Sequence, residues 1–187
     1  MRFIVIGLFM AIGLLPGGEW HVDGSAGNRV VFYSSSTLLD FKGETDAIDG
    51  YIYSPGDSLL SANTEVYFEV QPAFFNTGNG KRDRDMREDV LHTERYALSY
   101  FKGRLLIPEQ DGKKYRVTAK GEFFLHGVSR PVEITGSIFL YGNTALVKSR
   151  FSVLLKDYNI RAPKLLAFVK VAEKIDIEIE VTLLRVK

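Results

Sequence analysis

The sequence predicts an all-β fold, and two observations support this prediction. Two long segments, 115–126 and 132–141, alternate apolar and polar side chains on either side of a turn. Further strand-like segments recur from residue 20 to residue 183, at a spacing typical of a sandwich or a barrel. The chain has no cysteine, so hydrogen-bonded strands and apolar packing have to stabilise it without disulfides. Strand length and one-sided alternation favour a closed barrel.

The two alternating segments form the clearest predicted hairpin. Val117, Phe123 and Leu125 share one face of the first segment, and charged residues occupy the other face, with Phe124 as the exception. Glycine in the middle of such long strands indicates a sheet that curls. We predict the connecting turn at 127–131, where glycine and proline suit hairpin geometry. A curled sheet with an apolar inner face can enclose a ligand.

The remaining elements follow from the same alternation and from turn residues. Helical spacing of Met86, Val90 and Tyr96 predicts one short helix over 81–96. A second helical turn is predicted over 162–168, with Pro163 at its first position. The other expected strands are 20–23, 28–33, 47–53, 64–71, 98–107, 145–156 and 174–183.

The N-terminus has the pattern of a secretory leader. Arg2 precedes an apolar or glycine run of 13 residues, 3–15, followed by Pro16-Gly17-Gly18. A bilayer span needs about 20 residues, so we expect a signal peptide at 1–18 and one barrel domain at 19–187. The alternative is an uncleaved anchor. We expect an exported protein, periplasmic or secreted, that is not an integral membrane protein after cleavage.

The charge balance is nearly neutral and gives no support to a polyanionic partner. The chain has 24 Lys and Arg residues against 23 Asp and Glu residues. This balance favours neither a nucleic acid nor an anionic membrane surface. The segments that come nearest to a nucleophile elbow, a phosphate loop and a calcium loop all lack the required spacing.

Four motifs, taken in order and at their spacing, resemble the YceI-like family, whose members are exported lipocalin-like proteins that bind polyisoprenoid lipids. The motifs are Trp20-His21-Val22-Asp23; Asp40-Phe41-Lys42-Gly43 with 48–52; Asn76-Thr77 with 82–87, Thr93 and Tyr96; and 121–132, which contains His126 to Pro131. The resemblance spans residues 20–181. The sequence departs from the family pattern at Asp85, Ala97 and Phe124, which puts a polar role for the helical region in doubt.

The resemblance implies an eight-stranded antiparallel lipocalin-like barrel with one or two short helices, open at one end around an apolar tunnel. The alternative is a solid core with no cavity. Arg82 and Arg87 are candidate contacts for a polar head group. For these arginines the alternatives are a solvated helix face, or Arg82 and Asp83 fastening the helix to the barrel. The predicted ligand-binding wall is Phe32, Phe68, Phe101, Val117, Phe123, Leu125, Ile134, Ile138, Phe151, Val153 and Ile177.

The predicted function is non-enzymatic binding, carriage or sequestration of a long apolar lipid of the isoprenoid type. No catalytic residue, no metal and no cofactor is expected, apart from a bound isoprenoid lipid or quinone. His126 falls on the outer face by parity, and three scattered histidines make a poor metal site. One alternative is an enzyme or pigment-handling protein acting at the barrel mouth. Another is a structural barrel without a ligand, which binds partners through Tyr51, Tyr53, Phe139 and Tyr141.

Overall fold

The computed structural model describes residues 18–55, 60, 63–106, 109–166 and 169–186. The expected signal peptide, apart from Gly18, lies outside the described residues. The elements, in chain order, are β1 (Gly18–Val22), β2 (Arg29–Ser35), β3 (Asp40–Thr45), β4 (Ile48–Ser54), β5 (Glu65–Val70), η1 (Pro72–Phe74), α1 (Gly80–Asp85), η2 (Met86–Val90), β6 (Ser99–Leu105), β7 (Glu109–Asp111), β8 (Lys114–Leu125), β9 (Val128–Tyr141), β10 (Thr144–Leu154), η3 (Leu155–Tyr158), β11 (Lys164–Leu166), β12 (Val169–Lys170) and β13 (Lys174–Arg185).

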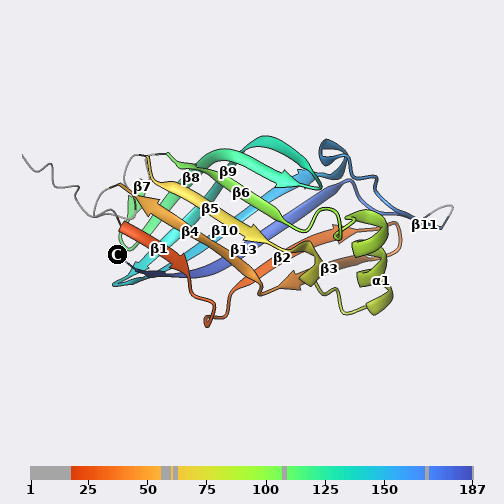
Figure 1. The fold of residues 1–187 in the computed structure, drawn as a ribbon, viewed down its shortest axis with the longest axis horizontal. Coiled ribbons are helices and arrows are strands. Elements are labelled where there is room, and N and C mark those ends of the chain that lie inside the picture. The colour runs from red at the N-terminus through yellow and green to blue at the C-terminus, as the bar shows by residue number, and fades with distance from the viewer. Residues whose placement is uncertain (1–17, 56–59, 61–62, 107–108, 167–168, 187) are drawn as a thin grey trace, which may run out of the picture.

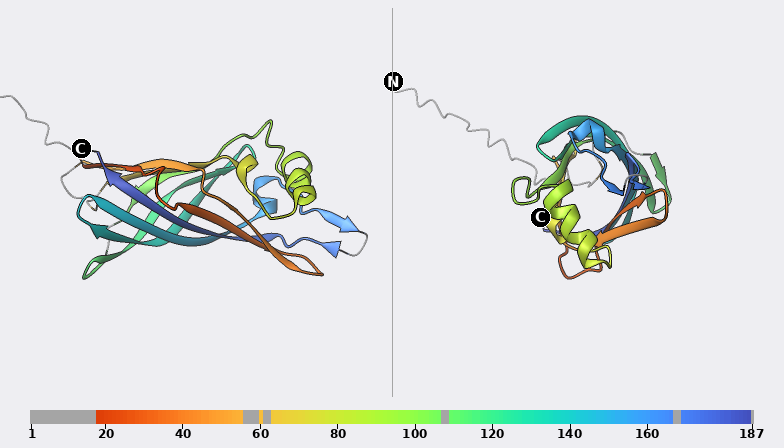
Figure 2. Two further views of the ribbon diagram at one scale, coloured as in Figure 1. Left: turned by 90° about the horizontal axis from the view of Figure 1, so that it is seen from below. Right: turned by 90° about the vertical axis from the view of Figure 1, so that its right-hand side faces the viewer.

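Eight strands close into an antiparallel barrel, which confirms the predicted fold class. The ring runs β1-β4-β5-β6-β8-β9-β10-β13 and closes where β13 pairs with β1. The β2–β3 hairpin continues along the same edge of β13, beyond β1 (Figure 1). At that end of the barrel lie the α1–η2 helix and the β11–β12 ribbon (Figure 2). We call this end the mouth.

The long hairpin is tighter than the sequence indicated. Leu125 pairs directly with Val128, so the turn is His126-Gly127 alone, with φ of 51° and 77°. Two positive φ values are typical of a type I′ turn. The prediction of a turn over 127–131 was therefore wrong, because Pro131 belongs to β9 and lies opposite Glu122. Hydrogen-bonded and non-hydrogen-bonded pairs alternate along this ladder, so the Pro131 nitrogen faces away from β8 and removes no hydrogen bond.

The ladder between β9 and β10 is incomplete. Pairing runs from Thr144↔Tyr141 only as far as Ser149↔Gly136, although both strands continue beyond that point. The Ser149 hydroxyl donates to the Thr135 carbonyl at 2.8 Å at this point. From this point toward the mouth, η3 links the two strands, because Arg130 Nε donates to the Asp157 carbonyl at 2.9 Å. The barrel wall therefore contains a seam bridged by η3.

The helical predictions were partly right. Asn79 caps α1 by accepting from the backbone N–H groups of Lys81 and Arg82. The helix continues through η2 and ends at Val90, well short of Tyr96, and His92 follows with φ of 46°. The segment 162–168 was predicted as a helical turn, and for its described residues, 162–166, this was wrong.

Of the described residues in this segment, 164–166 form β11, which pairs with β12. A proline at a first helical position only permits a helix, and so short a segment cannot repay helix nucleation. Antiparallel pairing satisfies its backbone instead. The Val171 N–H also donates to the Pro163 carbonyl at 3.2 Å.

An outer row of aromatic side chains explains Phe124, the residue that breaks the alternation of β8. Its ring stacks on Tyr100 of β6, with centroids 4.8 Å apart and planes 13° apart. Tyr100 contacts Tyr67, which stacks on Tyr51, so the row crosses β4, β5, β6 and β8. Burial and the neighbouring Glu69 carboxylate raise the pKa of Tyr67 to about 12. Cross-strand aromatic pairs of this kind stabilise a sheet from its wet face.

Strands β6 and β8 approach closely through a glycine pair, and this makes a prediction about stability. Gly103 and Gly121 lie directly opposite each other. A Cβ on Gly121 would lie 2.5 Å from the Gly103 Cα and closer still to the Lys102 carbonyl oxygen. Gly121→Ala should therefore lower the free energy of unfolding by roughly 2–4 kcal/mol, measured by urea denaturation.

Gly24→Ala is the control, because a Cβ there meets no atom within 4 Å. It should leave the stability almost unchanged. Equal stability of the two variants would contradict the close approach of β6 and β8.

Candidate ligand-binding cavity

A cavity of about 550 Å³ occupies the part of the barrel that faces the mouth. This volume is within the range of about 300–1,000 Å³ that is usual for small-molecule sites. Its wall is mainly aliphatic and aromatic. The structure places all eleven predicted residues on this wall: Phe32, Phe68, Phe101, Val117, Phe123, Leu125, Ile134, Ile138, Phe151, Val153 and Ile177. That they contact a ligand stays a prediction.

The two ends of the barrel interior differ. At the β1 end, Trp20, Ala145, Val181 and Leu183 are buried in the core and do not line the cavity. At the mouth, Leu39 lines the cavity although it is 53% exposed, so the cavity reaches the surface there. Among the described residues, the interior is therefore a pocket that opens at the mouth and ends on buried core side chains toward β1.

Glycines in the wall keep the phenylalanine rings out of the centre of the cavity. Phe32 lies over Gly43, its direct partner on β3, so closely that a Cβ on the glycine would clash with the ring. Phe68 covers Gly50 in the same way, because a Cβ there would lie 2.7 Å from the ring. A missing side chain on one strand thus makes room for a ring that lies against the wall. The space that the rings would otherwise fill remains empty.

The helix supplies wall residues that the strand pattern did not include. Met86, Val90 and Leu91 line the cavity, as do Pro163 and Val171 from the segment around β11 and β12. Met86 and Val90 could be identified from the sequence, because they form the apolar stripe of the predicted helix. Ser34, Ile175 and Ile179 also line the cavity, and continued alternation along β2 and β13 would have identified them.

Most of the polar side chains discussed at the mouth already form hydrogen bonds with neighbouring protein groups. Arg82 donates to the Thr77 hydroxyl and to the Thr77 carbonyl, both at 2.8 Å, and its guanidinium lies 4.7 Å from the centre of the Phe41 ring. Asp83 accepts from the Thr77 backbone N–H at 2.9 Å. These contacts fit the alternative in which Arg82 and Asp83 fasten the helix. Arg82 still lines the cavity, whereas Arg87 does not and instead donates to the Phe75 carbonyl at 3.3 Å.

Two histidines that are far apart in the sequence meet beside the mouth, which the sequence analysis missed. His92 Nδ1 lies 3.0 Å from His126 Nε2, and His126 Nδ1 lies 3.2 Å from the Tyr158 carbonyl oxygen. A carbonyl only accepts, so His126 Nδ1 donates to it and Nε2 accepts from His92. Tyr96 packs on the His126 ring with centroids 4.3 Å apart. This cluster joins the end of the helix to the β8–β9 turn and to η3.

The two turn residues that carry positive φ allow this meeting. His92 and His126 both adopt left-handed backbone conformations, which point their rings toward each other. No local sequence pattern predicts such a contact across 34 positions. Among the described ranges, no group of three or more His, Cys, Asp or Glu side chains is placed to hold a metal ion.

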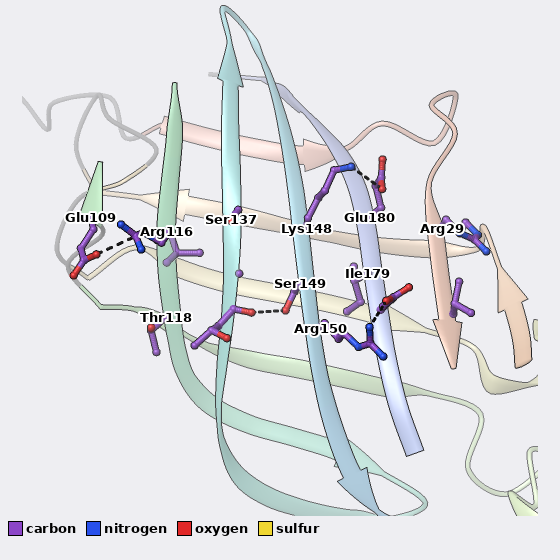
Figure 3. Close-up of a pocket in the computed structure, with 15 residues that line it drawn as sticks. Arg29, Glu109, Arg116, Thr118, Ser137, Lys148, Ser149, Arg150, Ile179 and Glu180 are labelled. Carbon is purple, nitrogen blue, oxygen red and sulfur yellow. Dashed lines mark hydrogen bonds and ion pairs between the residues drawn. The ribbon is translucent and has the colours of Figure 1, made fainter. Parts of the chain in front are cut away.

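A second hollow, of about 790 Å³, lies on the outer face of β8, β9, β10, β13 and β2 (Figure 3). Small side chains form its floor and long charged side chains its rim. Lys148 pairs with Glu180 at 2.9 Å and Arg150 with Glu178 at 3.0 Å. Arg29 and Arg116, the other two cations of the rim, are also paired with carboxylates. This hollow therefore presents no unpaired charge to an anionic ligand.

Comparisons with known proteins agree with this geometry. A family model described as a YceI-like domain matches residues 20–183. A comparison with curated proteins finds no match. Over the ranges that the structure describes, no helix is both long enough and apolar enough to cross a membrane.

Solved structures with the same fold share little sequence with this chain. Burkholderia cenocepacia BcnA has a TM-score of 0.69 at 16% identity and covers 86% of this chain and 98% of its own. A polyisoprenoid binding domain from Saccharophagus degradans, implicated in plant cell wall breakdown, has a TM-score of 0.67 at 15% identity, covering 89% and 98%. A Campylobacter jejuni YceI protein has a TM-score of 0.60 at 17% identity, covering 80% and 86%.

The histidine pair predicts a pH dependence of stability. Burial, with a smaller contribution from His92 and Arg95, lowers the pKa of His126 below its usual value of 6.5, although its bond to Tyr158 opposes this. The unfolded chain therefore takes up this proton at a higher pH than the folded chain. Stability from this group is complete above pH 6.5 and falls as the pH drops through the interval down to the lowered pKa.

His126→Asn should reduce the fall in stability over this pH interval, since asparagine does not titrate. The variant should keep the turn, because Asn-Gly suits a type I′ turn. Urea midpoints measured from pH 7.5 to pH 5 would show the difference between the two proteins. Parallel curves for wild type and variant would show that His126 contributes nothing to the pH dependence.

Proposed function

The chain belongs to the YceI-like family, and from this premise we propose that it binds, and carries or sequesters, a long apolar lipid of the isoprenoid type without catalysing a reaction on it. The observation that carries this proposal is the apolar cavity that opens at the mouth and ends on buried core side chains toward β1. The neighbour from Saccharophagus degradans, described as a polyisoprenoid binding domain, supports the ligand class. The leader pattern further supports an exported protein that acts in the periplasm or outside the cell.

The size of the cavity limits the part of a ligand that it holds. At about 30 Å³ per heavy atom, the share of a water molecule in the liquid, about 550 Å³ holds roughly 18 heavy atoms. That corresponds to about three to four isoprene units. At about 0.8 kcal/mol per buried carbon, such a tail gains roughly 14 kcal/mol before association costs of roughly 4–15 kcal/mol. A longer chain has to leave part of itself outside the mouth.

A polar end group would lie at the mouth, because the floor is closed by apolar core. Arg82 is the candidate for contact with it, since its guanidinium borders the cavity and its bonds to Thr77 hold it in place. Arg87 has no such position. A quinone ring or a polyprenyl oxygen would suit this end, with its tail directed toward the floor.

The alternatives fit the geometry less well. An enzyme at the mouth predicts polar groups that converge on the cavity, but Lys81 pairs with Asp85 at 2.5 Å and Arg82 is bonded to Thr77. A structural barrel without a ligand predicts a filled interior, whereas the cavity is wide and apolar. A lipid binder accounts for both observations.

Mass spectrometry of an organic extract of the purified protein tests the proposal. We expect an isoprenoid lipid or quinone in the extract, and uptake of added polyprenyl lipid by protein stripped of its lipid. A protein that carries no lipid and takes up neither polyprenyl lipid nor quinone would sink the proposal.

A cavity-filling variant tests the location of the tail. Ala119 lines the cavity, and Ala119→Leu adds three carbons that displace a similar volume of ligand. The affinity for the longest tail that fits should fall roughly 30-fold, since about 2 kcal/mol of burial is lost. Binding would be followed by fluorescence competition against a series of chain lengths.

Thr118→Leu is the matched control, because Thr118 lines the outer hollow on the opposite face of β8. It should leave affinity unchanged. A similar loss of affinity in both variants would place the tail outside the barrel.

A further inference from the structure

The turn between β2 and β3 exposes two adjacent leucines at the mouth. Leu38 is 68% exposed and Leu39 is 53% exposed. The hairpin that carries them projects beyond the barrel at the mouth (Figure 2). Burying even part of two leucine side chains is favourable, so their exposure at a projecting tip indicates a surface that becomes covered.

Several backbone groups of this tip already have partners within the turn. The Ser36 hydroxyl accepts from the backbone N–H groups of Leu38 and Leu39, at 3.3 and 3.2 Å. The Ser36 N–H donates to the Leu39 carbonyl at 2.8 Å. A peptide group that enters an apolar medium without a hydrogen bond costs several kcal/mol, and these groups avoid that cost. The N–H groups of Ser36, Leu38 and Leu39 and the Leu39 carbonyl therefore keep their partners when the tip enters hydrocarbon.

The tip is held in a fixed direction by the neighbouring ribbon. Ser36 forms a bridge with Val171, and the Ala172 N–H donates to the Ser35 carbonyl at 2.8 Å. Leu39 and Val171 both line the cavity. Apolar surface is thus continuous from the exposed tip, across the rim, into the cavity.

Charges on the tip itself do not favour an anionic surface, and Arg82, whose guanidinium lies over Phe41, is bonded to Thr77. Asp40 follows the leucines directly, and Lys42 pairs with Glu44 at 3.1 Å. Attraction at this site would be hydrophobic and only weakly dependent on salt. Two side chains are also far too small a patch for a stable protein interface, which buries about 800 Å² on each partner.

We propose that the Leu38–Leu39 tip docks the mouth onto a lipid bilayer, so that an isoprenoid chain passes between the membrane and the cavity without crossing water. The proposal rests on the proposed function for its ligand, but not for the docking itself. The leucines enter the outer part of the bilayer, and the cavity opening then faces the lipid. A chain too long for the cavity remains partly in the membrane while its end enters the barrel.

Flotation with vesicles of phosphatidylcholine that contain no isoprenoid tests docking separately from ligand binding. Wild-type protein should float with the vesicles at low and high salt. Leu38→Ser/Leu39→Ser should reduce the vesicle-bound fraction roughly ten- to hundredfold, because the apolar contribution of two leucines is lost. Leu106→Ser/Leu184→Ser is the matched control, since these leucines are 41% and 40% exposed and lie at the β1 end of the barrel, after β6 and near the end of β13. It should float like wild type.

The second measurement is the exchange of a fluorescent polyprenyl lipid. This measurement uses Leu38→Ser alone, because Leu39 lines the cavity and Leu38 does not. Leu38→Ser should take up as much lipid as wild type when the lipid is added from ethanol, but should extract it from vesicles about tenfold more slowly. Wild-type protein that stays unbound, or a tip variant that floats like wild type, overturns the docking proposal. Dimers of wild type that the tip variant cannot form, seen by sedimentation without lipid, would assign the tip to a second copy of this chain instead. Failure of lipid uptake by every protein would overturn the proposed function and leave the flotation result standing.

Discussion

The packing of phenylalanine rings against glycines is the constraint on which the rest of this barrel depends. Phe32 and Phe68 each lie over a glycine on the next strand, so their rings line the wall and do not meet in the centre. A barrel of about eight strands has an interior that side chains can fill completely. Replacing wall side chains by glycine at selected positions converts this interior into a cavity. The same contacts still bury the rings on one side, so the fold retains apolar packing while it keeps a hollow.

The β1 end of the barrel provides the buried core, and the opposite end provides the opening of the cavity. Trp20, Val181 and Leu183 make a solid core at the β1 end, where the ring of strands closes. The opposite end is assembled from a projecting hairpin, a short helix and a ribbon, each attached to the barrel along one side only. Elements of this kind move more readily than a closed ladder. Adaptation of the mouth to ligands of different length therefore need not disturb the ladder that holds the barrel closed.

The sequence predicted the wall well and the mouth poorly, for a physical reason. Alternation along a strand decides which face a side chain takes, so Phe123, Ile134 and Ile177 could be placed on the inner face from their parity alone. Contacts between distant segments decide where the helix ends, how β11 pairs with β12 and whether His92 reaches His126. Local propensity carries no information about such meetings. Phe124 illustrates both cases, because its outward direction followed from parity but its partner Tyr100 did not.

The seam between β9 and β10 has a consequence for how the barrel changes its girth. A fully laddered barrel has a circumference fixed by its strand number and stagger, so widening it means breaking strand pairs. Here the ladder stops at Ser149↔Gly136, and below that point the two strands are bridged through η3 by contacts such as Arg130 with the Asp157 carbonyl. Separating β9 and β10 in this part of the wall breaks no strand pair, because only the contacts of η3 with Arg130 and His126 have to shift there. The girth of the barrel near the mouth is therefore set by side-chain contacts, whereas the girth of the closed half is set by strand pairing.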